Sequence, residues 1–232
     1  MSQITTICLL KYNGFTNKFW ALSMMQFGHK YLKRVDGLTF YKLLGSGQDG
    51  FKPQPDWSVY GLLQVWENEE KAKAFFEHSE LLKKYRKKSK ELSILYLKSI
   101  KAHGEWSKTQ PFQKCHSLSQ NPKAVAIITR ASIKTSQLMR FWKYVPETQR
   151  AIENAKGLIY TKGMGELPIW EMATLSIWDS IDNVKNYAYS TEAHAKAITM
   201  TREYDWYKEE LFSRFEVYDI DGDWSEFEDL SI

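Results

Sequence analysis

The sequence predicts an α+β protein in which two ferredoxin-like βαββαβ units, joined in tandem, form an intramolecular α+β barrel. Three observations support this prediction. Segments of the first half recur in the second half in the same order, and each half shows the β-α-β-β-α-β order of that unit. In addition, an antiparallel sheet that carries helices on just one of its faces must bury its other face, and a second sheet can cover it. The chain has 232 residues, of which 43% are hydrophobic and 15% aromatic, enough for a large core.

The internal repeat rests on four matched pairs of segments. The offset between partners changes only from one element to the next, from 112 to 122 residues, which is hard to obtain by chance. The pairs are LLQVWENEEKAKAF (62–75) with TLSIWDSIDNVKNY (174–187), GLTFYK (37–42) with GLIYTK (157–162), KFW (18–20) with RFW (140–142), and GEW (104–106) with GDW (222–224).

Each element of the first copy has its own sequence signal. Runs rich in β-branched and apolar residues predict strands, apolar residues at helical spacing predict helices, and the Gly, Pro and Asp of residues 46–57 predict an irregular connection. The expected strands are 4–12, 37–45, 59–66 and 92–100, and the expected helices are 17–34 and 69–91; the second copy starts with a strand at 125–133. The expected domains are a first repeat at 1–103, a polar linker at 104–122 and a second repeat at 123–232.

Two sheets that pack face to face close the predicted barrel and leave the space between a sheet and a helix as the place for a ligand. His194 points to the second copy as the side with that space. Its helical neighbours are small, with Ser190 and Ala197 among them, whereas the matching position of the first copy is Leu82, among bulkier side chains. This asymmetry predicts a cofactor site in the second copy. An ordinary surface or core histidine is the alternative.

Composition sets limits on the class of protein. The net charge of +4 is mild, and the aromatic residues lie in no nucleic-acid motif, so no nucleic-acid partner is expected. Cys8 and Cys115 have no metal-binding spacing. We expect a cytoplasmic protein, because the first residues lack the pattern of a signal peptide and no segment approaches the length of a spanning helix. Reversible contact with a membrane surface stays open.

Several long segments resemble the spheroidene monooxygenases, carotenoid-oxidising enzymes that are similar to haem-binding dimeric α+β barrel proteins. The resemblance covers essentially the whole chain. It is carried by FWALSMMQFGHKYL (19–32), GLTFYKLLGSGQDGFKPQPD (37–56), TRASIKTSQLMRFW (129–142), KGMGELP (162–168), EAHAKAI (192–198) and WYKEELFSRFEV (206–217). It implies a haem b enzyme that uses O2 and electrons from reduced ferredoxin to convert a CH2 group of a carotenoid to a hydroxyl or ketone.

The resemblance also assigns roles to individual residues. It implies that His194 is the axial ligand of the haem iron, with Ala197 in the same family segment. The candidate partner for the other ring nitrogen of His194 is Ser190, Glu192 or a backbone carbonyl. Arg140 and Lys162 are the candidate partners of the haem propionates, and ordinary solvated charges are the alternative for each. The candidates for the distal side, where O2 would bind, are Arg130, Trp142 and Trp170, although packing is the simpler role for both tryptophans.

Two other interpretations stay open at the level of sequence. The same scaffold supports a haem enzyme with different chemistry, such as a dehydratase or peroxidase acting on a small substrate, or a barrel that binds haem or another hydrophobic ligand without catalysis. The basic run LLKKYRKKSKE (81–91) is either a solvated helix face, a docking patch for an acidic electron carrier such as ferredoxin, or a site of attraction to anionic lipid.

Overall fold

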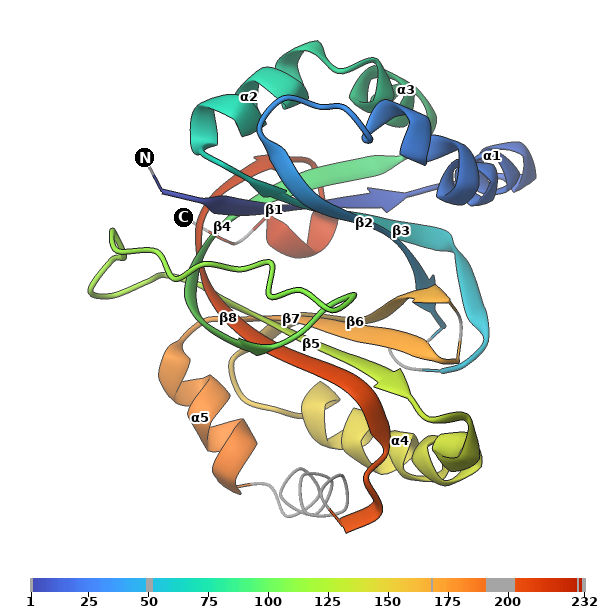
Figure 1. Cartoon of the computed structure of the whole chain (residues 1–232), viewed down its shortest axis with the longest axis vertical. Helices are drawn as coiled ribbons and strands as arrows, with labels where there is room; N and C mark the ends of the chain where they lie inside the picture. The colour runs from blue at the N-terminus through green and yellow to red at the C-terminus, as the bar shows by residue number, and fades with distance from the viewer. Residues whose placement is uncertain (1, 49–51, 168, 191–202, 229, 231–232) are drawn as a thin grey trace.

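The eight strands form one closed antiparallel barrel, with the helices of each half on its outside (Figure 1). The computed structural model describes residues 2–48, 52–167, 169–190, 203–228 and 230. The first half contains β1 (Ile4–Lys11), α1 (Phe15–Phe27), the 3₁₀ helix η1 (Gly28–Tyr31), β2 (Leu38–Gly47), β3 (Pro55–Trp66), α2 (Glu69–His78), α3 (Glu80–Lys88) and β4 (Glu91–Gly104). The second half contains β5 (Val125–Ile133), η2 (Thr135–Gln137), α4 (Leu138–Glu153), β6 (Leu158–Leu167), β7 (Glu171–Trp178), α5 (Ile181–Ser190), β8 (Tyr207–Gly222) and η3 (Ser225–Phe227).

The order of strands around the barrel is β1-β3-β2-β6-β7-β5-β8-β4, so each half contributes the strand order of a ferredoxin-like sheet. The two sheets join at both edges through equivalent strands. At one seam β4 pairs with β8 from Ser93 to Gly104, and at the other β2 meets β6 only around Gly45 and Gly165. The predicted fold class, a duplicated α+β barrel within one chain, is therefore confirmed.

The barrel interior is a packed hydrophobic core. Alternate residues of every strand point into it, such as Ile7 and Leu9 of β1 and Ile128 of β5. Segments outside the strands also fill it: Trp106 and Phe112 come from the linker between the repeats. The linker thus covers part of the barrel rather than acting only as a tether.

The outer faces of the sheets carry the helices, α1 to α3 above the barrel and α4 and α5 below it in Figure 1. The repeat is visible in the packing of these layers. Trp66 at the end of β3 contacts Phe75 of α2 with ring centroids 5.2 Å apart, and Trp178 contacts Tyr187 of α5 at 5.3 Å. Both residues of the second pair lie 112 positions after their partners in the first, which is the offset expected from the sequence.

The helix expected at 17–34 begins at Phe15, ends as an α-helix at Phe27 and continues as η1 to Tyr31, and β3 begins at Pro55 within the connection expected to be irregular. Two further differences are larger. The single helix expected at 69–91 is two helices, because Ser79 has an extended backbone and its hydroxyl accepts hydrogen bonds from the amides of Leu81 and Leu82, capping α3. The last strand of the first repeat, expected to end at residue 100, continues to Gly104. This extension carries β4 past its own sheet and along β8, which brings first-repeat side chains to the second repeat.

Within the ranges that the structure describes, no helix combines the length and hydropathy needed to cross a bilayer.

Candidate functional site

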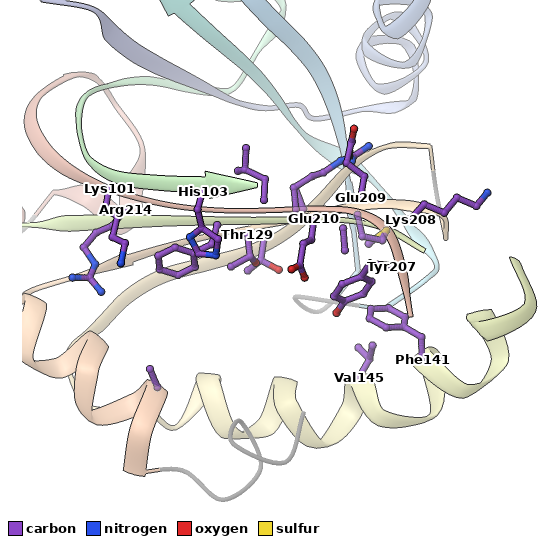
Figure 2. Close-up of a pocket in the computed structure, with 18 of the residues that line it drawn as sticks. Lys101, His103, Thr129, Phe141, Val145, Tyr207, Lys208, Glu209, Glu210 and Arg214 are labelled. Atoms are coloured by element: carbon purple, nitrogen blue, oxygen red, sulfur yellow. Dashed lines mark hydrogen bonds and ion pairs between the residues drawn. The ribbon is translucent and has the colours of Figure 1, made fainter. Parts of the chain in front are cut away.

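A cavity of about 1200 Å³ lies between the outer face of the second sheet and helices α4 and α5 (Figure 2). The corresponding place in the first repeat, bordered by Tyr12, Met24 and Tyr85, holds a cavity of only about 10 Å³. The sequence-based expectation of a ligand space between a sheet and a helix of the second copy agrees with this position.

Smaller side chains explain why the second repeat is hollow. Ala188 of α5 lines the cavity and is the counterpart, 112 residues later, of Phe76, which is buried in the first helical layer. Thr174 of β7 likewise replaces Leu62. Among the described residues, the buried hydrophobic cluster of this layer consists of Val125, Ile127, Ile152, Trp178 and Val184. Space that core side chains fill in one copy is left open in the other.

Aromatic residues form one end of the cavity. Phe141 of α4 and Tyr207 at the start of β8 lie side by side at this end in Figure 2 and contact each other edge to face, with ring centroids 6.3 Å apart. Phe141 also contacts Trp142 at 5.5 Å and the buried Trp206 at 5.9 Å, each edge to face. The Nε1 donor of Trp142 is buried and has no hydrogen-bond partner among the described residues. This end offers flat apolar surfaces and one unused N–H donor.

The opposite end is a cationic corner, formed by Lys101 of β4 and Arg214 of β8 (Figure 2). The two residues are direct cross-strand partners, and neither forms an ion pair with a carboxylate in the part of the chain that the structure describes. The Nε atom of Arg214 is buried without a hydrogen-bond partner there. Like charges opposite each other destabilise a sheet, so this pair is stabilised when an anionic group binds between them.

His103 lies beside this corner, two residues after Lys101 on the same strand. Its ring is 5.4 Å from the ring of Phe212 and tilted by 30° to it. Among the described histidines it is the one that borders the cavity. His103 had no predicted role.

Arg130 borders the cavity, but its side chain is only 5% exposed and forms ion pairs with Glu171 and Glu209. It lies on the same strand face as Ile128, which belongs to the barrel interior. Burial raises the pKa of Glu209, yet hydrogen bonds from the amides of Lys108 and Ser107 and the charge of Arg130 more than offset this, so its pKa is lowered. Arg130 therefore already has two carboxylate partners at its terminal nitrogens, whereas its Nε is buried without a hydrogen-bond partner among the described residues.

Lys162 also lies on the interior side of its strand, between Tyr160 and Met164, both of the barrel core. Its amino group pairs with Asp56 at 2.8 Å. Burial raises the pKa of Asp56, but the hydrogen bonds from Lys162 and Ser58 lower it by more. The ion pair joins the two repeats, and it keeps Lys162 away from the described lining of the cavity.

The remaining predicted residues lie in different surroundings. Arg140 is exposed on α4, with its guanidinium 4.5 Å from the ring centroid of Tyr204, and Trp170 is 42% exposed on the turn between β6 and β7. Neither lines the cavity in the described part of the chain, whereas Trp142 does. Ser190 is the last residue of α5, and His194 and Ala197 lie outside the described residues.

The lining residues with aromatic or cationic side chains that the sequence predictions did not include are Lys101, His103, Phe141, Tyr207 and Arg214. Three of them fall in segments that carried the family resemblance, but only the pairing of β4 with β8 shows that Lys101 and Arg214 meet. The sequence does contain one indication of these residues. Lys101 and His103 lie two positions apart just beyond the expected end of the strand, and this spacing is typical of a strand that continues with a polar face. Among the described residues, no three His, Cys, Asp or Glu side chains are grouped closely enough to hold a metal ion.

The fold and the cavity together define a class of protein: a duplicated α+β barrel with a ligand cavity under one of its two sheets. No protein-family model matches the chain. Two solved structures of aldoxime dehydratase, one in complex with butyraldoxime, share the fold with TM-scores of 0.65 and 0.62. They cover 94% of this chain and 82% and 80% of their own lengths, and at 10% sequence identity they show the fold alone.

Curated relatives in sequence are more specific. The chain is 30% identical to spheroidene monooxygenase of Rhodobacter capsulatus over 223 residues, which is 95% of this chain and 92% of the relative. It is 31% identical to the enzyme of Cereibacter sphaeroides, with 96% and 69% covered, and 38% identical to that of Rubrivivax gelatinosus, with 81% and 72% covered. The chain belongs to the spheroidene monooxygenase family, and the predicted resemblance is confirmed. This family membership makes the protein an oxidoreductase of the monooxygenase type.

Proposed function

We propose that this protein is a haem-dependent monooxygenase that oxidises a CH2 group of a carotenoid, using O2 and electrons from reduced ferredoxin. The observation that supports the proposal most is the cavity in the second repeat, aromatic at one end and cationic at the other. Its volume of about 1200 Å³ exceeds the roughly 300–1,000 Å³ of common small-molecule pockets, so it has room for a large flat cofactor.

The residues present fit haem on chemical grounds. Haem combines a flat apolar macrocycle with two carboxylates, and the cavity offers aromatic surfaces together with two cations that lack carboxylate partners among the described residues. Lys101 and Arg214 would bind the carboxylates, in place of the expected Arg140 and Lys162. His194 stays the predicted iron ligand, and it lies outside the described residues.

The reaction balances when the electron donor is included. One CH2, one O2, two electrons and two protons give one CHOH and one water; a second round at the same carbon gives a gem-diol, which loses water to form a ketone. Haem iron supplies the activation of O2 when it is bound.

The chain's own residues hold and orient the reactants. Phe141 and Tyr207 present aromatic surfaces that exclude water from the apolar end, and the Nε1–H of Trp142 can donate a hydrogen bond to an oxygen atom of a bound molecule. Thr129 and Thr174 add hydroxyl groups on the sheet side of the cavity.

The test is an absorption titration with hemin of the wild type, His194→Ala and His103→Ala. We expect a strong Soret band in the wild type and in His103→Ala, and a lost or shifted band in His194→Ala. Loss confined to His103→Ala would overturn the assignment of the iron ligand, and a wild type that takes up no hemin would overturn the proposed cofactor.

The substrate is tested separately, with the hemin-loaded wild type, reduced ferredoxin, a carotenoid and ¹⁸O2. Incorporation of label into a hydroxyl or keto product is the expected result. A loaded protein that returns the carotenoid unlabelled, or dehydrates an aldoxime instead, would refute the proposed reaction.

A further inference from the structure

Helix α1 exposes an apolar stripe to solvent. Phe15 is 86% exposed and Phe19 64% exposed, and Leu22 continues the line at a spacing of four and then three residues, which places all three on one side of the helix. The rings of Phe15 and Phe19 stack with their centroids 6.4 Å apart. Phe27, at the end of the helix, is 60% exposed.

The stripe is not needed for packing α1 onto the barrel. The helix contacts its sheet through the opposite side, where Ala21 and Met24 are buried. Single exposed apolar residues are ordinary, but contiguous ones mark a surface that another body covers.

The segment that contains α1 is rich in cations and contains no acids. Residues 13–35 contain no Asp or Glu and four cations, Lys18, Lys30, Lys33 and Arg34. Helix α3 lies beside α1, since Trp20 and Tyr85 contact edge to face at 5.9 Å. It adds further cations, and the amino groups of Lys30 and Lys84 both lie over the ring of Tyr31, at 4.9 and 5.6 Å from its centroid.

We define the docking face as Phe15, Phe19 and Leu22 of α1 together with the cations Lys18, Lys30, Lys33, Arg34, Lys84, Lys87 and Lys88. Within the described chain, none of these cations forms a salt bridge. In Figure 1, α1 and α3 lie in the layer above the barrel, and α4 lies on the other side of it.

We propose that the docking face binds reversibly to the surface of a membrane that contains anionic lipids. The phenylalanines would insert at the boundary between headgroups and acyl chains, and the lysines and arginine would contact lipid phosphates, which is the chemistry of interfacial amphipathic helices.

Two other occupants are disfavoured by the same charges. A second copy of this chain docking through a two-fold axis would bring the same cations against each other. An acidic protein would pair with the cations but would leave the aromatic stripe unexplained. The membrane satisfies both features, and this inference does not rest on haem binding.

The test is flotation of the full-length protein with vesicles of phosphatidylcholine alone or mixed with phosphatidylglycerol. We expect binding to the anionic vesicles only, weakened by high salt. Phe15→Ser/Phe19→Ser should weaken binding by about tenfold or more, because it removes two inserting rings. Lys30→Gln/Lys84→Gln should weaken it by roughly fivefold per cation.

Matched controls lie away from this face. Met139→Ser removes an apolar side chain that is 90% exposed on α4, the counterpart of α1. Lys114→Gln/Lys123→Gln removes two exposed cations, one in the linker and one directly after it. Both should bind as the wild type does, with unchanged circular dichroism in every variant. The proposal would be overturned if the wild type did not bind anionic vesicles, or if the controls lost as much binding as the test variants. A stable dimer that Phe15→Ser/Phe19→Ser abolishes would also overturn it.

Discussion

The cationic corner of the cavity makes a quantitative prediction about porphyrin binding. We consider Arg214→Met and Lys101→Met, each tested with metal-free protoporphyrin IX and with its dimethyl ester. The two porphyrins share the same macrocycle but only the first carries carboxylates, and the absence of iron removes any contribution from a histidine ligand.

The magnitude follows from the burial of each cation. Arg214 is half-buried with its Nε enclosed, so a charge-assisted hydrogen bond to a carboxylate should contribute about 2 kcal/mol, or roughly thirtyfold in Kd. Lys101 is exposed and screened by solvent, so its loss should cost about 0.5–1 kcal/mol, or roughly two- to fivefold. Neither substitution should change the affinity for the dimethyl ester by more than about twofold, because the apolar contacts remain.

The assay is a fluorescence-quenching titration, with Lys185→Met as the matched control. Lys185 also lines the cavity, but its charge is already compensated by Asp182 at 3.1 Å. Equal losses for both porphyrins would show that the substitutions disturb the cavity itself, and unchanged binding of protoporphyrin IX would refute the role of the corner. A wild type that binds neither porphyrin would instead refute the proposed cofactor.

Two further predictions concern stability. Arg130→Met should lower the free energy of unfolding by about 2 kcal/mol in chemical denaturation, because it leaves the half-buried carboxylates of Glu171 and Glu209 without their cation. Burial raises the pKa of Glu91. Hydrogen bonds from Lys11 and Ser225 have the larger effect and lower this pKa from 4.5 to about 2. Ionised Glu91 therefore adds about 1–2 kcal/mol to the free energy of unfolding above pH 4.5, and this stabilisation is lost as the pH falls toward 2. Glu91→Gln should remove this part of the acid sensitivity.

Each of these has its own control. Lys134→Met removes an ion pair with Asp205 that is far more exposed, so it should change stability little; a loss equal to that of Arg130→Met would contradict the argument from burial. For Glu91, denaturation curves of the wild type and Glu91→Gln that shift in parallel between pH 4.5 and 2 would show that other groups control the acid transition.

Much of the architecture was determined by the sequence alone, because it depends on local periodicity and on repetition. The matched segments and the βαββαβ order predicted two ferredoxin-like sheets, and the contacts of Trp66 with Phe75 and of Trp178 with Tyr187 reproduce the offset of 112 residues. The small residues of the second copy indicated which side would be hollow. Trp142, a candidate for the distal side, lines the cavity from α4, and its role there stays a prediction.

The chemistry of the cavity was decided by tertiary structure. Lys101 and Arg214 are 113 residues apart and meet only because β4 continues past its own sheet and pairs with β8. A positive charge can serve a ligand only when no carboxylate already compensates it, and sequence does not reveal that compensation. Arg130 and Lys162 looked suitable by position, but long-range contacts give them Glu171, Glu209 and Asp56 as partners on the interior face of the barrel. Periodicity determines which face of a strand a residue occupies, whereas the pairing of distant strands determines which charges are left to bind a ligand.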